Sequence, residues 1–269
     1  RNSKNFDSNW ISAGYATWYL REGKFLNNAR MQSHTSCAVS GSGWMVSEKI
    51  IRGMHGWDFH TLTEDIQFST FCAAHDICIG YAPAEFFDEQ PTTFKASWIQ
   101  RMRWTKGFYQ VFFSYWKDLL RGIGARKFSS YDMMMTIAPG MILTLLSFFV
   151  NATYLIVGNL SSGFLAKTNE IAMASGSLVM TFTSMYSVFF LLGLLTTITE
   201  YKHIHCDKKI KIITNLFTFP LFMMTYIPIT VAALFKKVEW VPTKHTIAVS
   251  FDDVVNTKAE ARSSESAQS

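Results

Sequence analysis

Three long stretches without a charged residue constrain this chain more than any other feature of its sequence. They cover residues 133–158, 171–199 and 212–235. Because a helix needs about 20 apolar residues to cross a bilayer, the first two runs predict transmembrane helices. Pro139 and Gly140 can kink the first of them without excluding it. The chain is therefore expected to fold in two solvents, with a water-soluble part ahead of a membrane region.

The third run leaves two readings open. Pro220 and Pro228 divide it. Lysines lie on both sides of it, at Lys208, Lys209, Lys211, Lys236 and Lys237. A single crossing would put one lysine cluster outside the cell, whereas basic loops normally stay inside. A broken hairpin that re-enters the membrane or lies at its surface is therefore the alternative to a span. We expect a cytosolic tail over residues 238–269, disordered after residue 250.

The distribution of charge favours lipid over nucleic acid as the anionic partner. Only 17% of the residues are charged and the net charge is +5, whereas a soluble domain carries about 25% charged residues. Basic side chains gather beside the apolar runs, at Lys117, Arg121, Arg126, Lys127 and within residues 202–211. Cytoplasmic loops that face anionic headgroups have this pattern. The sequence therefore predicts membrane lipids, and no nucleic acid, as partners.

The first 130 residues mix helical and strand-like patterns. Apolar spacing predicts helices over 7–30, 48–55, 61–74 and 94–120, and small or β-branched residues predict strands within 36–47 and 77–87. The last of these helices is basic and rich in aromatic residues, as expected at a membrane surface. The expected fold class is an incomplete α/β domain followed by an α-helical transmembrane region.

Two short motifs stand at a definite spacing within this framework. Thr63-Glu64-Asp65 opens one predicted helix, and Gln100-Arg101-Met102-Arg103-Trp104 lies in the next, ahead of the membrane segments. This order resembles the processive, inverting family 2 glycosyltransferases, namely the cellulose, chitin and hyaluronan synthases and the bacterial synthases of N-acetylglucosamine polymers. Their TED and QxxRW motifs match the two segments, and the resemblance covers roughly residues 30–245. It implies a GT-A-like catalytic domain.

The resemblance assigns the first motif to proton transfer. Inverting transfer of a sugar needs a carboxylate that takes the proton of the acceptor hydroxyl. Asp65 lies at a helix start, from which its side chain can be aimed into a cleft, and is therefore the expected base. Thr63 and Glu64 are expected to cap and orient the same helix.

The second motif is assigned to substrate binding. The forked donor groups of Arg103 suit the leaving diphosphate. Trp104 offers a flat apolar face to the acceptor sugar, and Gln100 can donate and accept hydrogen bonds nearby. Arg101, inside the motif, is counted among the same substrate-binding residues.

Two further segments extend the expected site. Ser42 and Gly43 belong to a glycine-broken loop where the family has small residues near the donor and acceptor sugars. Trp240, Thr243 and Lys244 resemble the family's segment after the membrane helices, which reaches back to the nucleotide. Here the spacing is one residue longer than in the tightest versions of that segment.

The nucleotide-binding half of the family is not recognised in this sequence. The carboxylates of its DxD motif hold a divalent metal on the diphosphate, and no D-x-D occurs in these 269 residues. Asp252 and Asp253 do not form one, because they are adjacent and lie in the polar tail. We expect Mg²⁺ or Mn²⁺ in the full-length enzyme, with ligands outside this chain, and we expect these 269 residues not to turn over alone. The expected division is a cytosolic transferase part at 1–93, the QxxRW segment and interfacial helix at 94–130, the membrane region at 131–237 and the tail at 238–269.

The resemblance implies a multi-pass enzyme of the plasma membrane with a cytosolic catalytic domain. It would transfer a sugar from a UDP-sugar, with UDP-N-acetylglucosamine favoured, to a growing β-linked polysaccharide. Two alternatives stay open. One is a non-processive transferase that acts on a lipid-linked acceptor, and the other is a transporter or scaffold with a vestigial transferase domain.

A cysteine in place of Lys244 tests the predicted side of the tail. In cells that express the full-length protein, a membrane-impermeant maleimide should label Lys244→Cys only after permeabilisation, because the tail is expected in the cytosol. The unsubstituted protein gives the background from its native cysteines. Labelling of Lys244→Cys from outside intact cells would contradict the cytosolic tail and its expected contact with the nucleotide.

Overall fold

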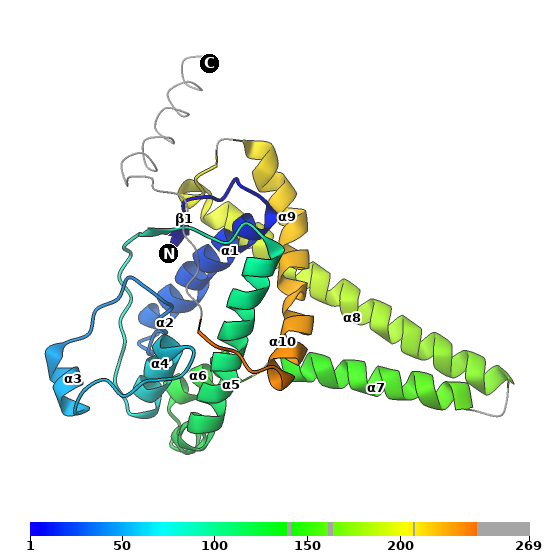
Figure 1. Cartoon of the computed structure of the whole chain (residues 1–269), viewed down its shortest axis with the longest axis horizontal. Helices are drawn as coiled ribbons and strands as arrows, with labels where there is room; N and C mark the ends of the chain where they lie inside the picture. Colours follow the sequence, from blue (N-terminus) through cyan, green and yellow to red (C-terminus); the bar gives the residue numbers. More distant parts are fainter. Residues whose placement is uncertain (139–140, 161–163, 207, 241–269) are drawn as a thin grey trace, which may run out of the picture.

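Figure 1 shows the computed structural model of the chain, which is built mainly from helices. The structure describes residues 1–138, 141–160, 164–206 and 208–240. In chain order the elements are β1 (Asn2–Ser3), α1 (Trp10–Arg21), the π-helix η1 (Glu22–Asn27), α2 (Asn28–Gln32), α3 (Glu48–Gly53), α4 (Glu64–Ala74), β2 (Phe87–Asp88), α5 (Phe94–Gly124), α6 (Phe128–Ile137), α7 (Met141–Leu160), α8 (Phe164–Thr199), the 3₁₀ helix η2 (Tyr201–His203), α9 (Lys209–Met224) and α10 (Tyr226–Phe235). The pair α7 and α8 projects from the remaining body as a two-helix arm.

The 31-residue helix α5 is the central element of the body. Its start is capped, because the Thr93 side chain accepts a hydrogen bond from the amide of Ala96 at 3.2 Å. One side of α5 packs on α4 and α6, and another side packs on α10. The helix expected over 94–120 is therefore confirmed, and it serves as the scaffold to which the other elements attach.

The main hydrophobic core lies where α4, α5 and α6 meet. Its buried members on these helices are Ile66, Ala73, Val111, Leu119, Met133, Met134 and Ile137. Each large aliphatic side chain that leaves water here contributes about 1.5–3 kcal/mol to folding. This core fixes the direction in which α4 meets α5.

The strands expected within residues 36–47 and 77–87 do not form, apart from Phe87, which begins β2. In the part of the chain that the structure describes, the sheet consists of β1 and β2 alone, paired in parallel over two residues each. The expected strands run side by side only locally, where the amide of Cys37 donates to the carbonyl of Ile79 at 2.9 Å. An isolated strand pair is marginal without further strands to extend the ladder. The described fold is thus mainly helical, and no sheet-rich GT-A core is seen in it.

The first apolar run is not a single transmembrane helix, which corrects the expectation for residues 133–158. Helix α6 ends at Ile137, and the following Ala138 has a ψ of 131°. A residue that precedes a proline is pushed into this extended conformation, so the helix stops there. The beginning of the run is therefore buried in the body core, and Pro139 and Gly140 lie outside the described residues.

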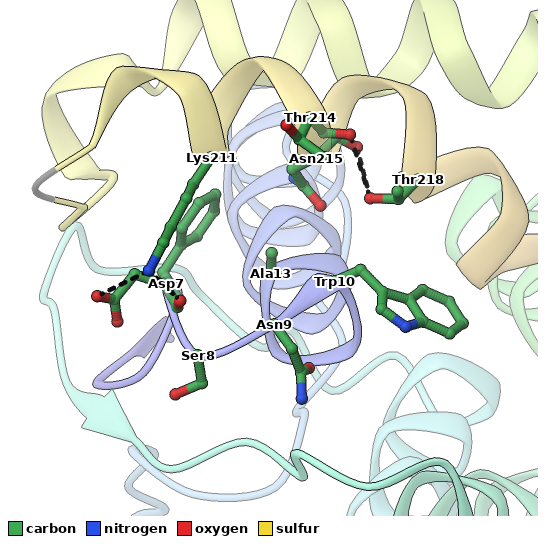
Figure 2. Close-up of a pocket in the computed structure, with 10 residues that line it drawn as sticks. Asp7, Ser8, Asn9, Trp10, Ala13, Lys211, Thr214, Asn215 and Thr218 are labelled. Atoms are coloured by element: carbon green, nitrogen blue, oxygen red, sulfur yellow. Dashed lines mark hydrogen bonds and ion pairs between the residues drawn. The ribbon is translucent and has the colours of Figure 1, made fainter.

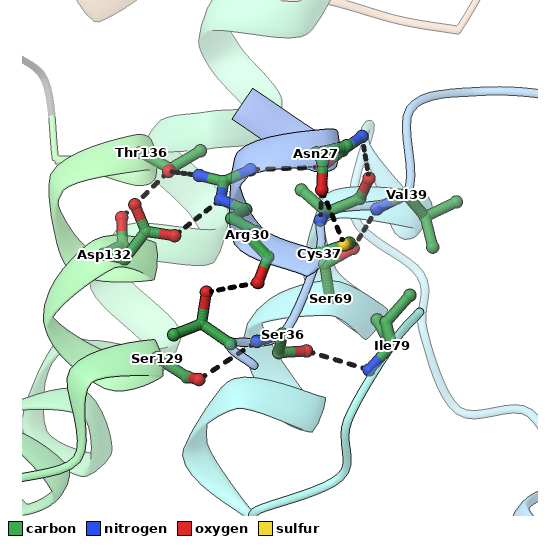
Figure 3. A network of polar contacts seen from close by, with 12 residues as sticks. Asn27, Arg30, Ser36, Cys37, Val39, Ser69, Ile79, Ser129, Asp132 and Thr136 are labelled. Atoms are coloured by element: carbon green, nitrogen blue, oxygen red, sulfur yellow. Dashed lines mark hydrogen bonds and ion pairs between the residues drawn. The ribbon is translucent and has the colours of Figure 1, made fainter. Parts of the chain in front are cut away.

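A polar network fixes α6 to the body (Figure 3). The guanidinium of Arg30, in α2, donates to Asp132 Oδ2 at 2.6 Å and to Thr136 Oγ1 at 2.7 Å. It also donates to Asn27 Oδ1 at 3.3 Å. A buried charge with a carboxylate and further acceptors around it is stable, whereas loss of the carboxylate would leave it uncompensated. Helix α6 is therefore attached to the body through α2.

Two described segments are long and apolar enough to cross a membrane, judged by length and composition. They are Thr168–Thr199, in α8, and Lys209–Phe235, which comprises α9 and α10. The helix expected at 171–199 lies within the first segment. The described apolar part of α7, Leu146–Leu160, is shorter than a span. Helix α7 itself covers 20 residues, Met141–Leu160. The second apolar run keeps its expected place, and the crossing of a membrane by the three runs stays a prediction.

Helices α9 and α10 are buried against the body to a greater extent than α8, whose C-terminal part packs on α9 and α1. Of their most apolar window, 39% is buried inside the protein, against 6% for α8. Helix α9 packs on α1 through Phe219 and Phe222, and α10 packs on α5. The two helices meet at Thr225, between Pro220 and Pro228. The expected division of the third run is seen, while its crossing of a membrane stays a prediction.

A methyl group at Gly14 tests the packing of α1 on α9. A Cβ there would lie 2.5 Å from Cγ of Phe222, so Gly14→Ala should destabilise the protein by about 1–3 kcal/mol. Gly176, in α8, has nothing within 4 Å of its Cβ position, and Gly176→Ala is the matched control. Thermal unfolding in detergent should show a lower midpoint for Gly14→Ala alone. Equal midpoints for both variants would show that α1 and α9 are not packed closely.

Candidate active site

The two sequence motifs meet where α5 passes the start of α4. Both backbone groups of Leu62, the residue before the first motif, are held by α5. Its amide donates to Gln110 Oε1 at 3.0 Å, and its carbonyl accepts from Arg103 Nη1 at 2.9 Å. On the same helix, Gly107 faces Thr63 so closely that a Cβ would overlap the Thr63 side chain. The predicted proximity of the two motifs is therefore a property of the structure.

Thr63 occupies the N-cap position of α4 but does not cap it with its side chain, which corrects that expectation. The side chain is buried against α5, and its hydroxyl has no hydrogen-bond partner among the described residues. The close approach of Gly107 explains this, because the contact points the side chain toward α5. Glu64 is exposed in the first turn, where its charge suits the positive end of the helix dipole.

The carboxylate of Asp65 is held by two backbone amides. Its Oδ2 accepts from the amide of Gly41 at 2.5 Å, and its Oδ1 accepts from the amide of Ile66 at 2.8 Å. Asp65 remains partly exposed, so the bound carboxylate can still reach a ligand. The two amide donors fix the direction of the carboxylate. The arrangement can therefore hold a carboxylate ready to accept a proton.

The glycine-broken loop lies against Asp65, as its composition suggested. Gly41 has a φ of +73° and Gly43 a φ of +78°, values that glycine adopts without strain. The Trp44 indole donates to the Gly41 carbonyl at 2.9 Å and so holds the loop from its other side. Ser42 and Gly43, the residues predicted for the site, are exposed on this loop. Gly41 was missed, although the alternation of glycine and serine marked its loop.

The residues of the second motif point in different directions from α5. Arg103 faces the first motif, as described above. Trp104 packs on α1, with ring centres 5.8 Å from Tyr15 and 6.5 Å from Tyr19. Gln100 is partly exposed one turn before Trp104. Arg103 therefore faces the start of α4, whereas Trp104 faces α1, and their shared role in binding stays a prediction.

Arg101 faces the junction of α9 and α10 and is fully buried. Its Nη1 donates to the Phe222 carbonyl at 3.0 Å and to Thr225 Oγ1 at 2.7 Å. Its guanidinium also lies 4.4 Å from the ring centre of Phe222 and 5.0 Å from that of Tyr226. In this conformation Arg101 links α5 to the junction of α9 and α10, and its assignment to substrate binding stays a prediction.

The segment after α10 turns back across α5. Val238 packs with Met102 and Tyr109 on that helix, and Trp240 follows with 62% of its surface exposed. The contact of this segment with the nucleotide, which the resemblance implied, stays a prediction. Thr243 and Lys244 lie outside the described residues, and so does the tail expected to be disordered.

The hollow shown in Figure 2 is separate from the motif residues. It lies between the start of α1 and α9, with Asn9 and Trp10 on one side and Asn215 on the other. Lys211 closes one end, where its Nζ donates to the carbonyl of Asp7 at 2.7 Å. These contacts join α9 to the segment before α1, so the hollow belongs to the packing of the body.

The described residues offer no group of three or more His, Cys, Asp or Glu side chains that could hold a metal ion. Mg²⁺ or Mn²⁺ therefore has no site assigned to it in this part of the chain. The expectation that its ligands lie outside the chain stays a prediction for the full-length enzyme.

Comparison with known proteins gives one family and one type of relative. The model described as Glycosyl transferase family group 2 matches residues 2–235. Proteins described as Beta-monoglucosyldiacylglycerol synthase, from Trichormus variabilis and Nostoc sp., are 34% identical over 101 residues, or 36% of this chain and 21% of each relative. That of Synechocystis sp. is 32% identical over 82 residues, or 29% of this chain and 17% of the relative. The match thus spans about a fifth of the length of these relatives. No solved structure matches the chain significantly.

A methyl group at Gly107 tests the contact between the motifs. Gly107→Ala should push α5 away from Thr63, because the added carbon would overlap that side chain. We expect a loss of about 1–3 kcal/mol of stability and faster amide hydrogen exchange over residues 62–67. Gly124→Ala, on the same helix with open space around it, is the control. Unchanged exchange over these residues in Gly107→Ala would contradict the close contact.

Proposed function

This chain belongs to glycosyl transferase family group 2, and on that premise we propose that it forms part of an enzyme that transfers a hexose from a UDP-sugar to a lipid acceptor. The observation that carries the proposal is the contact of α5 with the start of α4. Arg103 donates to the Leu62 carbonyl, and Asp65 lies in the first turn of α4, which follows Leu62 in sequence. This contact gives a single site both a base and a phosphate-binding group. The relatives named as Beta-monoglucosyldiacylglycerol synthase support glucose as the sugar and diacylglycerol as the acceptor.

In the proposed reaction Asp65 is the base. The acceptor hydroxyl attacks the anomeric carbon from the face opposite the diphosphate, and its proton passes to the Asp65 carboxylate. The bond between the anomeric carbon and the diphosphate oxygen breaks, and UDP leaves with the electron pair. Attack from the opposite face turns the α-linked donor into a β-linked product, as the names of the relatives suggest for them. The amide of Gly41 keeps the carboxylate oriented during this step.

Arg103 and Trp104 are proposed to bind the donor and the acceptor. A guanidinium has five N–H groups, so the Nη1 that donates to Leu62 anchors the side chain while the fork can still face a diphosphate. The buried rings of Tyr15 and Tyr19 hold the Trp104 indole in place. The part of the indole that stays exposed suits the apolar face of a sugar or glycerol unit. Since the described residues supply no metal cluster, no step is assigned to a metal.

A membrane-bound enzyme with a cytosolic site fits the apolar segments and the placement of charge. The arm exposes large apolar side chains along α7 and α8, such as Phe149, Ile156, Met180 and Leu191. Basic residues follow the motif helix, as cytosolic loops require. A lipid acceptor would be delivered to the site from the same membrane. We therefore propose a multi-pass protein with its motifs on the cytosolic side.

Polymer synthesis from UDP-N-acetylglucosamine is the second candidate function. The order of the TED and QxxRW motifs favours it, because the processive members of the family share that order. Transfer of one sugar to a lipid needs the same base and the same diphosphate contact. The number of sugars in the product is the property that separates the two candidates.

Replacing Asp65 by asparagine tests the proposed base. In membranes that hold the full-length protein, UDP-glucose and diacylglycerol should give a product with a single glucose. Asp65→Asn should lower the rate by about 10²–10⁴-fold, because the amide cannot take the proton. Asp118→Asn, on the exposed part of α5, is the matched control and should keep the wild-type rate.

The donor and the length of the product decide between the candidates. Parallel reactions with UDP-N-acetylglucosamine and UDP-glucuronate show which donor is consumed, and mass spectrometry shows the product length. A polymer made from UDP-N-acetylglucosamine would replace the lipid proposal with the second candidate. Wild-type turnover in Asp65→Asn would overturn the role of the base in both.

A further inference from the structure

Glu22 is a carboxylate close to the proposed site that neither motif contains. It is the first residue of the π-helix η1, directly after α1. Its Oε2 accepts a hydrogen bond from Ser40 Oγ at 3.2 Å. The two residues are 18 positions apart in sequence, so the bond joins the end of α1 to the loop beside Asp65. A single π-turn inside a run of helix is often found at functional sites.

The loop that Glu22 contacts is attached at three consecutive residues. The amide of Val39 donates to Ser69 Oγ at 2.8 Å, Ser40 donates to Glu22, and the amide of Gly41 donates to Asp65 Oδ2 at 2.5 Å. Beyond Gly41 the loop is exposed. The Gly41 amide is therefore positioned by the two attachments that precede it and by the Trp44 indole, which donates to the Gly41 carbonyl.

The charges around Glu22 suit a fixed carboxylate. Burial raises the pKa of the Glu22 carboxyl, while the hydrogen bond from Ser40 and the guanidinium groups of Arg1, Arg21 and Arg30 oppose that rise. Three positive charges thus act on one acid, whose hydrogen-bond donor is Ser40.

We propose that Glu22 is a positioning residue for the transfer reaction: by accepting the Ser40 hydroxyl it fixes the loop whose next amide orients Asp65. The inference rests on the proposed function, in which Asp65 is the base. Glu22 acts through Ser40 and Gly41 and does not itself contact the substrate. Its amide analogue keeps an oxygen that can accept the Ser40 hydroxyl, whereas alanine cannot.

Four variants of the full-length protein test this role. They are Glu22→Ala, Glu22→Gln, Ser40→Ala and the double variant Glu22→Ala with Ser40→Ala. Glu22→Ala and Ser40→Ala should each lower kcat by about tenfold to hundredfold, the effect expected when a reacting group is misplaced, with little change in the KM for the UDP-sugar. Glu22→Gln should restore most of kcat. The double variant should be no slower than either single variant, because the two single changes remove the same hydrogen bond.

A second measurement follows the loop without relying on activity. Hydrogen exchange over residues 39–43 should be faster in Glu22→Ala than in wild type and Glu22→Gln, with an unchanged unfolding midpoint. Glu48→Ala, which removes an exposed acid of α3, is the matched control and should change neither exchange nor kcat. The exchange measurement still tests the inference if the wild-type protein transfers no sugar. That outcome would contradict the proposed function and not the role of Glu22 in the loop.

Several results would overturn the inference. Glu22→Ala with wild-type exchange over the loop would show that the Ser40 bond does not fix it. Glu22→Gln as slow as Glu22→Ala would show that the charge, and not the hydrogen bond, is required. Rate losses that multiply in the double variant would show that Glu22 and Ser40 act independently.

Discussion

The attachment of Leu62 to α5 is the interaction on which the site depends. One helix holds both backbone groups of this residue, through Arg103 and Gln110. The start of α4 follows at once, so α5 sets the position of the backbone that carries Asp65, while the Gly41 amide orients its carboxylate. Gly107 allows the backbones to approach because it carries no Cβ. Two motifs far apart in sequence thus become one site through a contact that neither motif contains in full.

The same helix connects the site to the apolar segment. Arg101 is fully buried, and its guanidinium lies among the rings of Phe222 and Tyr226 with hydrogen bonds to the junction of α9 and α10. A buried charge is costly unless hydrogen bonds and aromatic faces replace water around it. Such a cation tolerates little displacement of its partners. A shift of α9 or α10 would therefore displace Arg101 and, with it, the part of α5 that carries Arg103.

The loop before α3 completes the site from the other side. Its attachments to Ser69 and Asp65 come from α4 and its attachment to Glu22 comes from η1, and the three follow one another along the backbone. The Asp65 carboxylate is therefore held by parts of the chain that are each attached elsewhere. Such a framework pre-organises a carboxylate, as the proposed role of a general base requires. The apolar arm supplies none of these three attachments.

The sequence by itself determined the helix of residues 94–120, the apolar helix at 171–199, the order of the two motifs and the family. These follow from local spacing and residue type, which do not need the rest of the fold. It could not determine the strands, because pairing depends on neighbours, or the fate of residues 133–137, because apolar side chains suit a protein core as well as lipid. Only the tertiary structure decided that Arg101 and Arg103 serve different partners, since residues two apart on a helix point to different sides. It also revealed Gly41, Gln110 and Glu22, whose contacts cross the chain and leave no pattern in the sequence.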